Sequence, residues 1–251
     1  MRYLVLSDIH GNLEALEAVL AAAGPYDAAL VLGDLVGYGA DPNGVVERIR
    51  HLPTAALVRG NHDKVAAGLG GAQDFNYVAR SAVAWTAATL TPENLAWLAT
   101  LPEGPCVVDA AIEVCHGAPF DEDAYVFDEV DALRAIQAAR RPLCLFGHTH
   151  VAAVFRVAAD ADGGRVRVEP VASSNRAGFE VALDPRWRYL VNCGAVGQPR
   201  DGDPRAAYGI VDADARRVTL LRVPYDVAAA QAKIVAAGLP AVLAQRLAMG
   251  R

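Results

Sequence analysis

The sequence indicates an α/β (α+β) fold that combines parallel with antiparallel strands. In the first sixty residues, short apolar runs alternate with segments whose apolar residues recur at helical spacing, as in β-α-β units. After residue 150, strand-like runs follow one another across short turns, which favours antiparallel pairing. Because no linker rich in Pro or Ser interrupts the chain, we expect one domain over residues 1–251 that contains two sheets.

The first half supplies alternating strands and helices. Apolar residues recur at helical spacing over residues 13–23, and Pro42 occupies a typical first position of a second helix. Residues 63–104 are expected to be helical, with a helix start at Thr91-Pro92. The strands expected in this half are residues 3–6, 28–32, 55–58, 106–109, 112–115 and 143–146. An amphipathic helix is expected over residues 129–140.

The second half has a different character. The strands expected there are residues 151–157, 165–171, 188–191, 208–211 and 218–223, with a turn at residues 160–164. Helical spacing returns over residues 228–237 and 241–249. We therefore expect residues 151–251 to form the second sheet and the C-terminal helices.

Composition excludes several classes of protein. Hydrophobic residues make up 53% and charged residues 21% of the 251 residues, too apolar a chain for disorder. A formal net charge of −6 disfavours a protein that grips nucleic acid through its own Lys and Arg. No apolar run approaches the roughly 20 residues of a membrane helix, and no signal peptide is apparent. We expect a cytoplasmic protein whose four widely spaced cysteines are reduced, and homo-oligomerisation stays open.

Metal-ligand residue types follow the expected strands, at the edge where open α/β sheets bind ligands. These residues are Asp8, His10, Asp34, Asn61, His62, His116, His148 and His150. Five of the six histidines stand at such positions, and only His51 does not. A single histidine there is more often a capping or core residue, but five at equivalent positions are hard to explain by packing. Asp8 and His10 are two residues apart, so both point the same way if the segment is extended.

Asp8 and Asp34 each end an apolar run, so we expect both carboxylates to be buried. A buried carboxylate without a partner is costly, and neither strand end supplies a Lys or Arg. A metal ion is the simplest source of positive charge. Oxygen and imidazole ligands without thiolate suit Mn, Fe, Zn or Ni.

Five short motifs carry a resemblance to a known family. They are Asp8-Ile9-His10, Gly33-Asp34, Gly60-Asn61-His62-Asp63, Cys115-His116-Gly117 and Gly147-His148-Thr149-His150. They resemble, in order, the motifs of calcineurin-like metallophosphoesterases, and residues 192–200 look like the glycine loop of small prokaryotic members. The resemblance implies a four-layer α-β-β-α sandwich of two mixed sheets flanked by helices, with a dinuclear metal centre.

The resemblance also implies roles for single residues. One divalent ion, most commonly manganese, would be held by Asp8, His10, Asp34 and His150. The other would be held by Asp34, Asn61, His116 and His148, so that Asp34 bridges the two. A hydroxide shared by the metals would attack phosphorus, and His62 would protonate the leaving group as a general acid.

The chain departs from the protein-phosphatase members after Asp34. They follow this motif with an Asp-Arg pair, whereas here Asp34 is followed by Leu35-Val36-Gly37-Tyr38-Gly39, so the orienting partner of His62 is unidentified. Since a diester carries less charge than a monoester, this favours a phosphodiesterase that acts on small or nucleotide-like phosphate esters. The alternatives are a phosphomonoesterase, a symmetrical dinucleoside-polyphosphate hydrolase, and a non-catalytic scaffold of the same fold. Degenerate scaffolds tend to lose the catalytic histidine, whereas this chain keeps His62.

Several residues outside the metal motifs are candidates for substrate contact, each with a structural alternative. Asn12 can bind phosphate or cap a helix, and Tyr38 can stack on a base or anchor its loop. Arg200 and Arg205 can clamp a second phosphate or form salt bridges across a turn. Asp63 is a candidate support for its neighbours or a helix cap. Further candidates for a cleft wall are Phe75, Asn76 and Tyr77.

Overall fold

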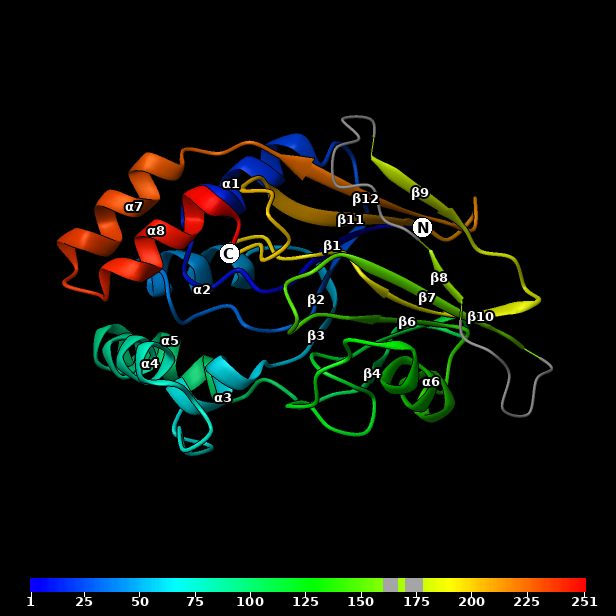
Figure 1. The fold of residues 1–251 in the computed structure, drawn as a ribbon, viewed down its shortest axis with the longest axis horizontal. Helices are drawn as coiled ribbons and strands as arrows, with labels where there is room; N and C mark the ends of the chain where they lie inside the picture. Colours follow the sequence, from blue (N-terminus) through cyan, green and yellow to red (C-terminus); the bar gives the residue numbers. More distant parts are fainter. Residues whose placement is uncertain (160–166, 170–177) are drawn as a thin grey trace.

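A computed structural model describes residues 1–159, 167–169 and 178–251 of the chain. Two mixed six-stranded sheets face each other, and helices cover their outer faces (Figure 1). This arrangement confirms the expected α/β sandwich of two mixed sheets flanked by helices.

The first sheet is built around the N-terminal strand. Its order is β3 (Thr54–Leu57), β2 (Ala28–Val31), β1 (Arg2–Leu6), β11 (Ala206–Asp212), β12 (Arg217–Val223) and β9 (Phe179–Ala182). β1, β2 and β3 are parallel, as β-α-β connections require, and β11 joins β1 in antiparallel register with Leu4 opposite Ile210.

The second sheet has the same mixture of directions. Its order is β4 (Cys106–Val107), β5 (Ile112–Val114), β6 (Leu143–Phe146), β10 (Trp187–Asn192), β7 (Ala153–Ala158) and β8 (Arg167–Glu169). β5, β6 and β10 are parallel, with Leu145 of β6 opposite Val191 of β10. The carboxyl ends of parallel strands from both sheets therefore point toward one end of the sandwich.

Eight helices are present in the described part of the chain. They are α1 (Leu13–Ala22), α2 (Pro42–Arg50), α3 (Asn61–Ala66), α4 (Tyr77–Thr89), α5 (Pro92–Leu98), α6 (Glu129–Ala138), α7 (Val227–Ala236) and α8 (Ala241–Met249). Side-chain caps begin several of them. Asn12 accepts a hydrogen bond from the Ala15 amide, Thr91 caps the Pro92 helix as expected, and Asp128 begins α6.

Alternate residues of each central strand pack into different cores. Leu4 and Leu6 of β1 face the core under α1 and α2, whereas Val5 faces the core between the sheets. Phe146 of β6 packs on the other side of the second sheet, against α6 residues such as Ile136. Since the central strands are buried on both faces, they are continuously apolar, and polar groups can gather only at their ends.

Two expectations about elements are wrong. Residues 151–251 do not form a sheet of their own: β10 pairs with β6 and β11 pairs with β1, so both sheets mix the halves of the chain. The expected helical stretch over residues 63–104 is interrupted between α3 and α4 and ends at α5. In addition, the sequence pattern predicts no strand over Phe179–Ala182, where the structure forms β9. Part of the expected strand 165–171 and the turn at 160–164 lie outside the described residues.

Candidate metal centre

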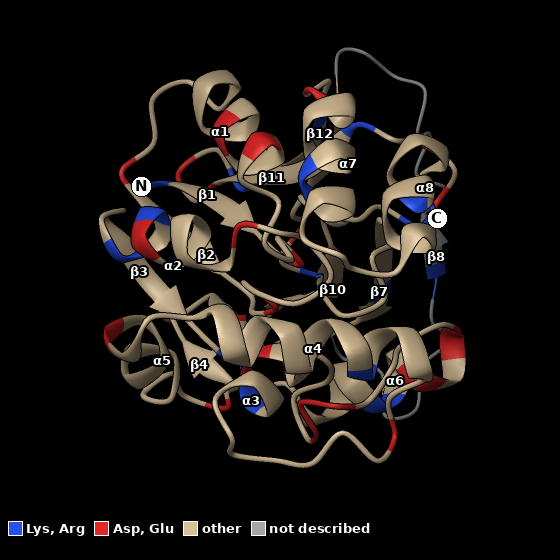
Figure 2. Ribbon diagram, turned by 90° about the vertical axis from the view of Figure 1, so that its left-hand side faces the viewer, with Lys and Arg blue, Asp and Glu red and all other residues tan. Residues whose placement is uncertain are grey.

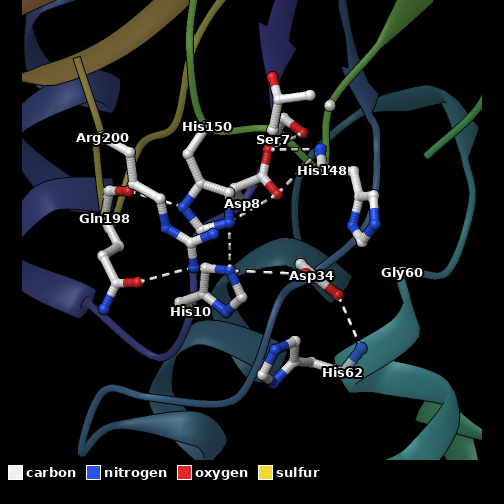
Figure 3. Close-up of polar contacts among 12 residues, drawn as sticks. Ser7, Asp8, His10, Asp34, Gly60, His62, His148, His150, Gln198 and Arg200 are labelled. Atoms are coloured by element: carbon white, nitrogen blue, oxygen red, sulfur yellow. Dashed lines mark hydrogen bonds and ion pairs between the residues drawn. The ribbon is translucent and has the colours of Figure 1, made fainter. Parts of the chain in front are cut away.

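The polar residues that follow the strands converge at one site, and Figure 3 shows Asp8, His10, Asp34, His148 and His150 there. Asp8 and His10 follow β1, Asp34 follows β2, Asn61 begins α3 after β3, His116 follows β5, and His148 and His150 follow β6. Except for Asn61, which is half-buried, all of these side chains are buried. The burial expected for Asp8 and Asp34 is confirmed, since the exposed fraction of each is at most 1%.

The backbone aims these side chains through an unusual conformation. Asp8, His10, Asp34, His148 and His150 all have positive φ angles, between 49° and 66°. This left-handed region is unfavourable for residues other than glycine and is retained mainly where surrounding structure enforces it. Here the amides of residues 9 and 10 both donate to the Asp34 carbonyl, at 2.8 and 2.9 Å, which clasps the first two strand ends together.

The expected reason for the alignment of Asp8 and His10 is therefore wrong. Their φ angles of 53° and 49° exclude an extended segment. A tight turn after β1 brings the two side chains to the same site.

The ligand-type atoms form two groups that share one residue. The first group is Asp8, His10, Asp34 and His150, and the second is Asp34, His116 and His148. Within each group, the ligand atoms all lie within 4.8 Å of one another. The Asn61 Oδ1 atom lies 3.2 Å from His116 Nε2, which adds an amide oxygen to the second group.

Asp34 lies between the groups. Its Oδ2 atom is 3.5 Å from His10 Nε2 and 3.4 Å from His116 Nε2. Its Oδ1 atom accepts a hydrogen bond of 2.9 Å from the His62 amide (Figure 3). One carboxylate therefore contacts both imidazole groups and also orients the start of α3.

The hydrogen bonds of three imidazoles determine which ring nitrogen faces the site. Nδ1 of His10, His116 and His150 lies 3.0, 2.8 and 2.6 Å from the carbonyl oxygens of Val36, Leu32 and Gln198. A carbonyl only accepts, so each Nδ1 carries the proton and each Nε2 presents a lone pair in the neutral ring. Metal-binding histidines are oriented in this way, with the other ring nitrogen donating to a carbonyl.

The close approach of donor atoms fits divalent cations. His10 Nε2 lies 3.1 Å from His150 Nε2, and His116 Nε2 lies 3.1 Å from His148 Nδ1. Two lone pairs repel at this separation unless a proton or a cation lies between them. In the described residues, the ion pairs of Asp8 and Asp34 are all with histidines and none is with Lys or Arg. The imidazole and carboxylate donor set therefore fits metal ions of the expected kind.

Burial and charge perturb the titration of this cluster. Burial lowers the pKa of His148 to about 3 and raises the pKa of Asp8 to about 6. For His116 burial lowers the pKa, but the Asp34 carboxylate outweighs it and raises the pKa to about 10. A cation that binds here displaces this proton, so metal affinity depends on pH.

His62 lies beside the two groups, and aromatic rings hold it in place. Its ring centroid is 4.4 Å from that of Tyr38, 4.6 Å from that of Phe75 and 4.9 Å from that of His10. Its Nδ1 atom is buried and has no hydrogen-bond partner in the described residues, and burial lowers its pKa to about 4. Packing, not a carboxylate, thus orients this ring.

Two neighbours of His62 explain how this packing is maintained. Asp63 accepts hydrogen bonds from the Gly60 amide at 3.0 Å and the Val36 amide at 3.1 Å, so it ties the two loops together. Burial raises its pKa to about 7. Gly37 has a φ of 89°, and a Cβ there would lie 2.4 Å from His62 Nδ1, so only glycine fits beside the ring.

The four residues predicted to contact substrate lie in different environments. Arg200 reaches the site: its guanidinium carbon lies 5.8 Å from the Tyr38 ring centroid, and it donates to Gln198 Oε1 at 3.1 Å (Figure 3). Tyr38 is buried against His10 and His62, so it is a loop anchor and does not present a free face to a base.

Asn12 and Arg205 have structural partners instead. Asn12 caps α1 and donates to the Gly197 carbonyl and the Tyr225 hydroxyl. Arg205 pairs with Asp203 at 2.6 Å in the salt-bridged turn. Of the candidates for a cleft wall, Phe75 contacts His62, whereas Tyr77 is 75% exposed at the start of α4.

Sequence reasoning missed three residues at the site. Ser7 donates to Asp8 Oδ2 at 2.6 Å, and Gln198 supports both His150 and Arg200. Tyr125 stacks on His148, with 3.8 Å between the ring centroids. Adjacency to Asp8 is a signal for Ser7, but no local pattern marks Tyr125, which reaches the site from the long connection between β5 and α6.

Comparison with known proteins agrees with this geometry. A profile of the calcineurin-like phosphoesterase superfamily domain matches residues 1–216. An uncharacterized protein of Methanocaldococcus jannaschii is 35% identical over 257 residues, which cover 98% of this chain and 97% of that protein.

Two solved structures share the whole fold. A metallophosphoesterase of Sphaerobacter thermophilus matches with a TM-score of 0.85 and 41% identity, over 100% of this chain and 99% of that chain. A hypothetical protein of Pyrococcus horikoshii matches with a TM-score of 0.76 and 20% identity, over 100% and 98% of the two chains, which supports the fold alone. With its motifs gathered at one site and its matches covering nearly the whole chain, the protein belongs to the calcineurin-like phosphoesterase superfamily, a family of metal-dependent enzymes.

Proposed function

We propose that this chain is a phosphodiesterase that binds two divalent metal ions, with manganese the first candidate, and hydrolyses small or nucleotide-like phosphate esters. The observation that carries the proposal is the position of Asp34, whose Oδ2 atom is within 3.5 Å of an imidazole nitrogen in each ligand group. A carboxylate in that position can bridge two cations.

The proposed ligands divide as the geometry suggests. One ion takes Asp8, His10, Asp34 and His150, and the other takes Asp34, Asn61, His116 and His148. Two bound cations supply charge that polarises the phosphoryl oxygens and lowers the pKa of a water molecule toward neutrality. The carbonyl-bound Nδ1 atoms hold three of the imidazoles in the tautomer that this binding requires.

His62 is the proposed general acid. It lies at the edge of the first ligand group, with its ring 4.9 Å from that of His10. Nδ1 is buried, so Nε2 is the atom left to deliver a proton to the oxygen of the leaving alcohol, once the bound anionic ester favours the protonated ring that burial disfavours. The hydrogen bond from its backbone amide to Asp34 Oδ1 holds His62 beside the proposed bridging carboxylate.

The preference for a diester rests on the positive charge near the site. Residues 35–39 after Asp34 include no Arg to offset the second charge of a monoester, and the Val36 backbone forms hydrogen bonds with His10 and Asp63. Arg200 is the guanidinium at the rim in the described structure, and we propose that it contacts the single anionic oxygen of a diester.

A comparison of two dye esters tests the proposal. Metal-stripped protein, reloaded with Mn²⁺, is assayed with bis-p-nitrophenyl phosphate and with p-nitrophenyl phosphate, and bound metal is counted by mass spectrometry. We expect two ions per chain and metal-dependent turnover that favours the diester. Preference for the monoester would favour a phosphomonoesterase or a symmetrical dinucleoside-polyphosphate hydrolase, and metal binding without turnover would favour a scaffold.

The His62→Ala variant separates the proposed roles at the site. We expect it to bind both ions, because His62 is outside both ligand groups, and to lose turnover by about 10²–10⁴-fold, the usual contribution of general acid catalysis. Full activity would refute the proposed role. Loss of metal would show instead that the residue supports the ligands.

The cellular compartment and the domain organisation of the enzyme are also proposals. None of the helices in the described ranges is long and apolar enough to cross a membrane. The four cysteines are free, and Cys115, Cys144 and Cys193 are buried, which fits a reducing compartment. We propose a cytoplasmic enzyme in which residues 1–251 act as one domain, because each sheet takes strands from both halves of the chain.

A further inference from the structure

We infer that Tyr125 and Phe127 form a platform that holds the aromatic base of a nucleotide-like ester while its phosphate lies at the metal centre. The inference rests on the proposed function and names the substrate group that this face selects. It starts from a stack of three rings. Tyr125 stacks on His148 with 3.8 Å between centroids and on Phe127 with 5.1 Å between centroids and 7° between planes.

The stack leads from the centre to solvent. The exposed fraction is 4% for His148, 46% for Tyr125 and 67% for Phe127. Large exposed aromatic side chains at the rim of a polar site are typical of contact surfaces for flat ligands. Since stacking on an aromatic ring is available to every base, such a platform gives affinity for nucleobases without strict choice among them.

The connection that carries the platform is pinned to the catalytic side of the molecule. Glu122 is 7% exposed, and its two oxygens accept hydrogen bonds of 2.9 Å from the Arg59 guanidinium. Lys64, from the helix that begins with Asn61, lies 3.0 Å from the same carboxylate. A platform that is held in place before binding loses less entropy when a ring stacks on it.

Charge on this face argues for an uncharged ring and against further phosphates. The acidic residues next to the platform in the sequence are Asp121, Asp123, Asp128, Glu129 and Asp131, and Figure 2 shows acidic positions in red on α6. Lys64 and Arg59 are already paired with acidic partners, and the Arg134 guanidinium lies over the Phe120 ring. A polyphosphate or a nucleic-acid backbone would be repelled here, whereas the base of a single nucleotide would not.

The test compares two diesters that share a leaving group. Mn²⁺-loaded enzyme is assayed with p-nitrophenyl thymidine 5′-phosphate and with p-nitrophenyl methyl phosphate. In Tyr125→Leu and Phe127→Leu, which keep apolar bulk but remove the ring, we expect KM for the thymidine ester to rise about tenfold. In Phe127→Leu, the variant that leaves the Tyr125 ring on His148 in place, we expect KM for the methyl ester to change less than twofold. An equal rise for both esters would overturn the inference, since the platform would then hold the p-nitrophenyl group.

Phe120→Leu is the matched control. Phe120 is on the same connection and is 46% exposed like Tyr125, but its ring is covered by Arg134 and is not part of the stack. We expect the control to match the wild type with both esters. A control that behaves like Tyr125→Leu would overturn the inference, because the effect would then come from the connection as a whole.

A binding measurement keeps the inference separate from the proposed function. Calorimetry with thymidine 5′-phosphate and with methyl phosphate needs no turnover. We expect the Mn²⁺-loaded wild type to bind the thymidine ester about tenfold more tightly, and the two platform variants to lose that difference. If neither diester is hydrolysed but the difference in binding is present, the proposed function fails and the platform stands. If turnover is present and the two ligands bind equally, the platform fails alone.

Discussion

Gly60 provides a sharp test of how Asp34, the proposed bridging carboxylate, is positioned. Its φ of −102° is open to any residue, so a change to alanine introduces no backbone strain. A Cβ at this position would nevertheless lie 2.1 Å from Asp34 Oδ1 and 2.4 Å from the Asp34 amide nitrogen. Ordinary contact begins at 3.4 Å, so Asp34 or the start of α3 must move by about 1 Å in Gly60→Ala.

That displacement affects both halves of the proposed chemistry. The same Oδ1 atom accepts a hydrogen bond from the His62 backbone amide, and Oδ2 lies between the two ligand groups. A misplacement of about 1 Å in an active site can cost about 10²-fold in rate, which corresponds to about 2.7 kcal/mol in transition-state stabilisation. We therefore expect kcat/KM to fall by about 10²-fold and Mn²⁺ affinity to fall about 10–100-fold.

The assays are diester hydrolysis under saturating Mn²⁺, calorimetric Mn²⁺ titration and thermal unfolding. Gly68→Ala is the control at the far end of the same helix: its φ is 73°, and a Cβ there meets nothing within 4 Å. The control carries backbone strain of about 1–2 kcal/mol without a clash, so it should lower Tm and leave kcat/KM within twofold. If Gly60→Ala retains wild-type kcat/KM and Mn²⁺ affinity, the geometric reasoning is refuted.

Further predictions concern stability and chemical reactivity. Each bound Mn²⁺ ion, at a hundredfold excess over its Kd, should stabilise the fold by about 2.7 kcal/mol and raise Tm by about 5–10 °C; an unchanged Tm would argue against resident metal. Burial raises the pKa of Glu122, but hydrogen bonds from Arg59 and Lys64 outweigh it and hold the pKa below its ordinary value of 4.5. The contribution of the Glu122 carboxylate to the free energy of unfolding is therefore present above pH 4.5. It is lost as the pH falls through the lowered pKa of the folded state. Glu122→Gln should cost about 1–3 kcal/mol in urea unfolding at pH 7, and this cost should shrink as the pH falls below 4.5; a cost that stays constant on acidification would contradict this. Burial raises the pKa of Cys193 to about 12, so in the native protein we expect a thiol reagent to modify Cys106 alone, and all four cysteines only after denaturation. Leu145→Ala should lower the free energy of unfolding by about 2–5 kcal/mol, because this fully buried side chain fills the core between the sheets; a cost below about 1 kcal/mol would mean that the core collapses around it.

Local chemistry in the sequence accounts for much of the fold and most of the candidate site. Apolar runs locate the central strands because these strands are buried on both faces and can carry polar groups only at their ends. Asp8 and Asp34 are recognisable as buried for the same reason. Helix starts such as Thr91-Pro92 follow from caps that involve only neighbours in the chain.

Contacts between distant segments determine the remaining features of the fold and of the candidate site. Pairing of β10 with β6 and of β11 with β1 depends on which strand edges are free when the sheets assemble, and no local pattern records it. Arg200 and Arg205 look alike in sequence, yet the fold sends the first to the site and pairs the second with Asp203. The left-handed backbone at five ligand-type residues is likewise imposed by loops that clasp each other across the strand ends.

The division between these two kinds of information has a single physical cause. Periodicity, caps and buried charge are properties of short segments, so residue types and their spacing reveal them. The role of Tyr125 depends on His148, Glu122 and Arg59, which converge only after both sheets form. The candidate metal ligands were therefore predictable from motifs at strand ends, whereas the proposed substrate platform depends on packing between distant parts of the chain.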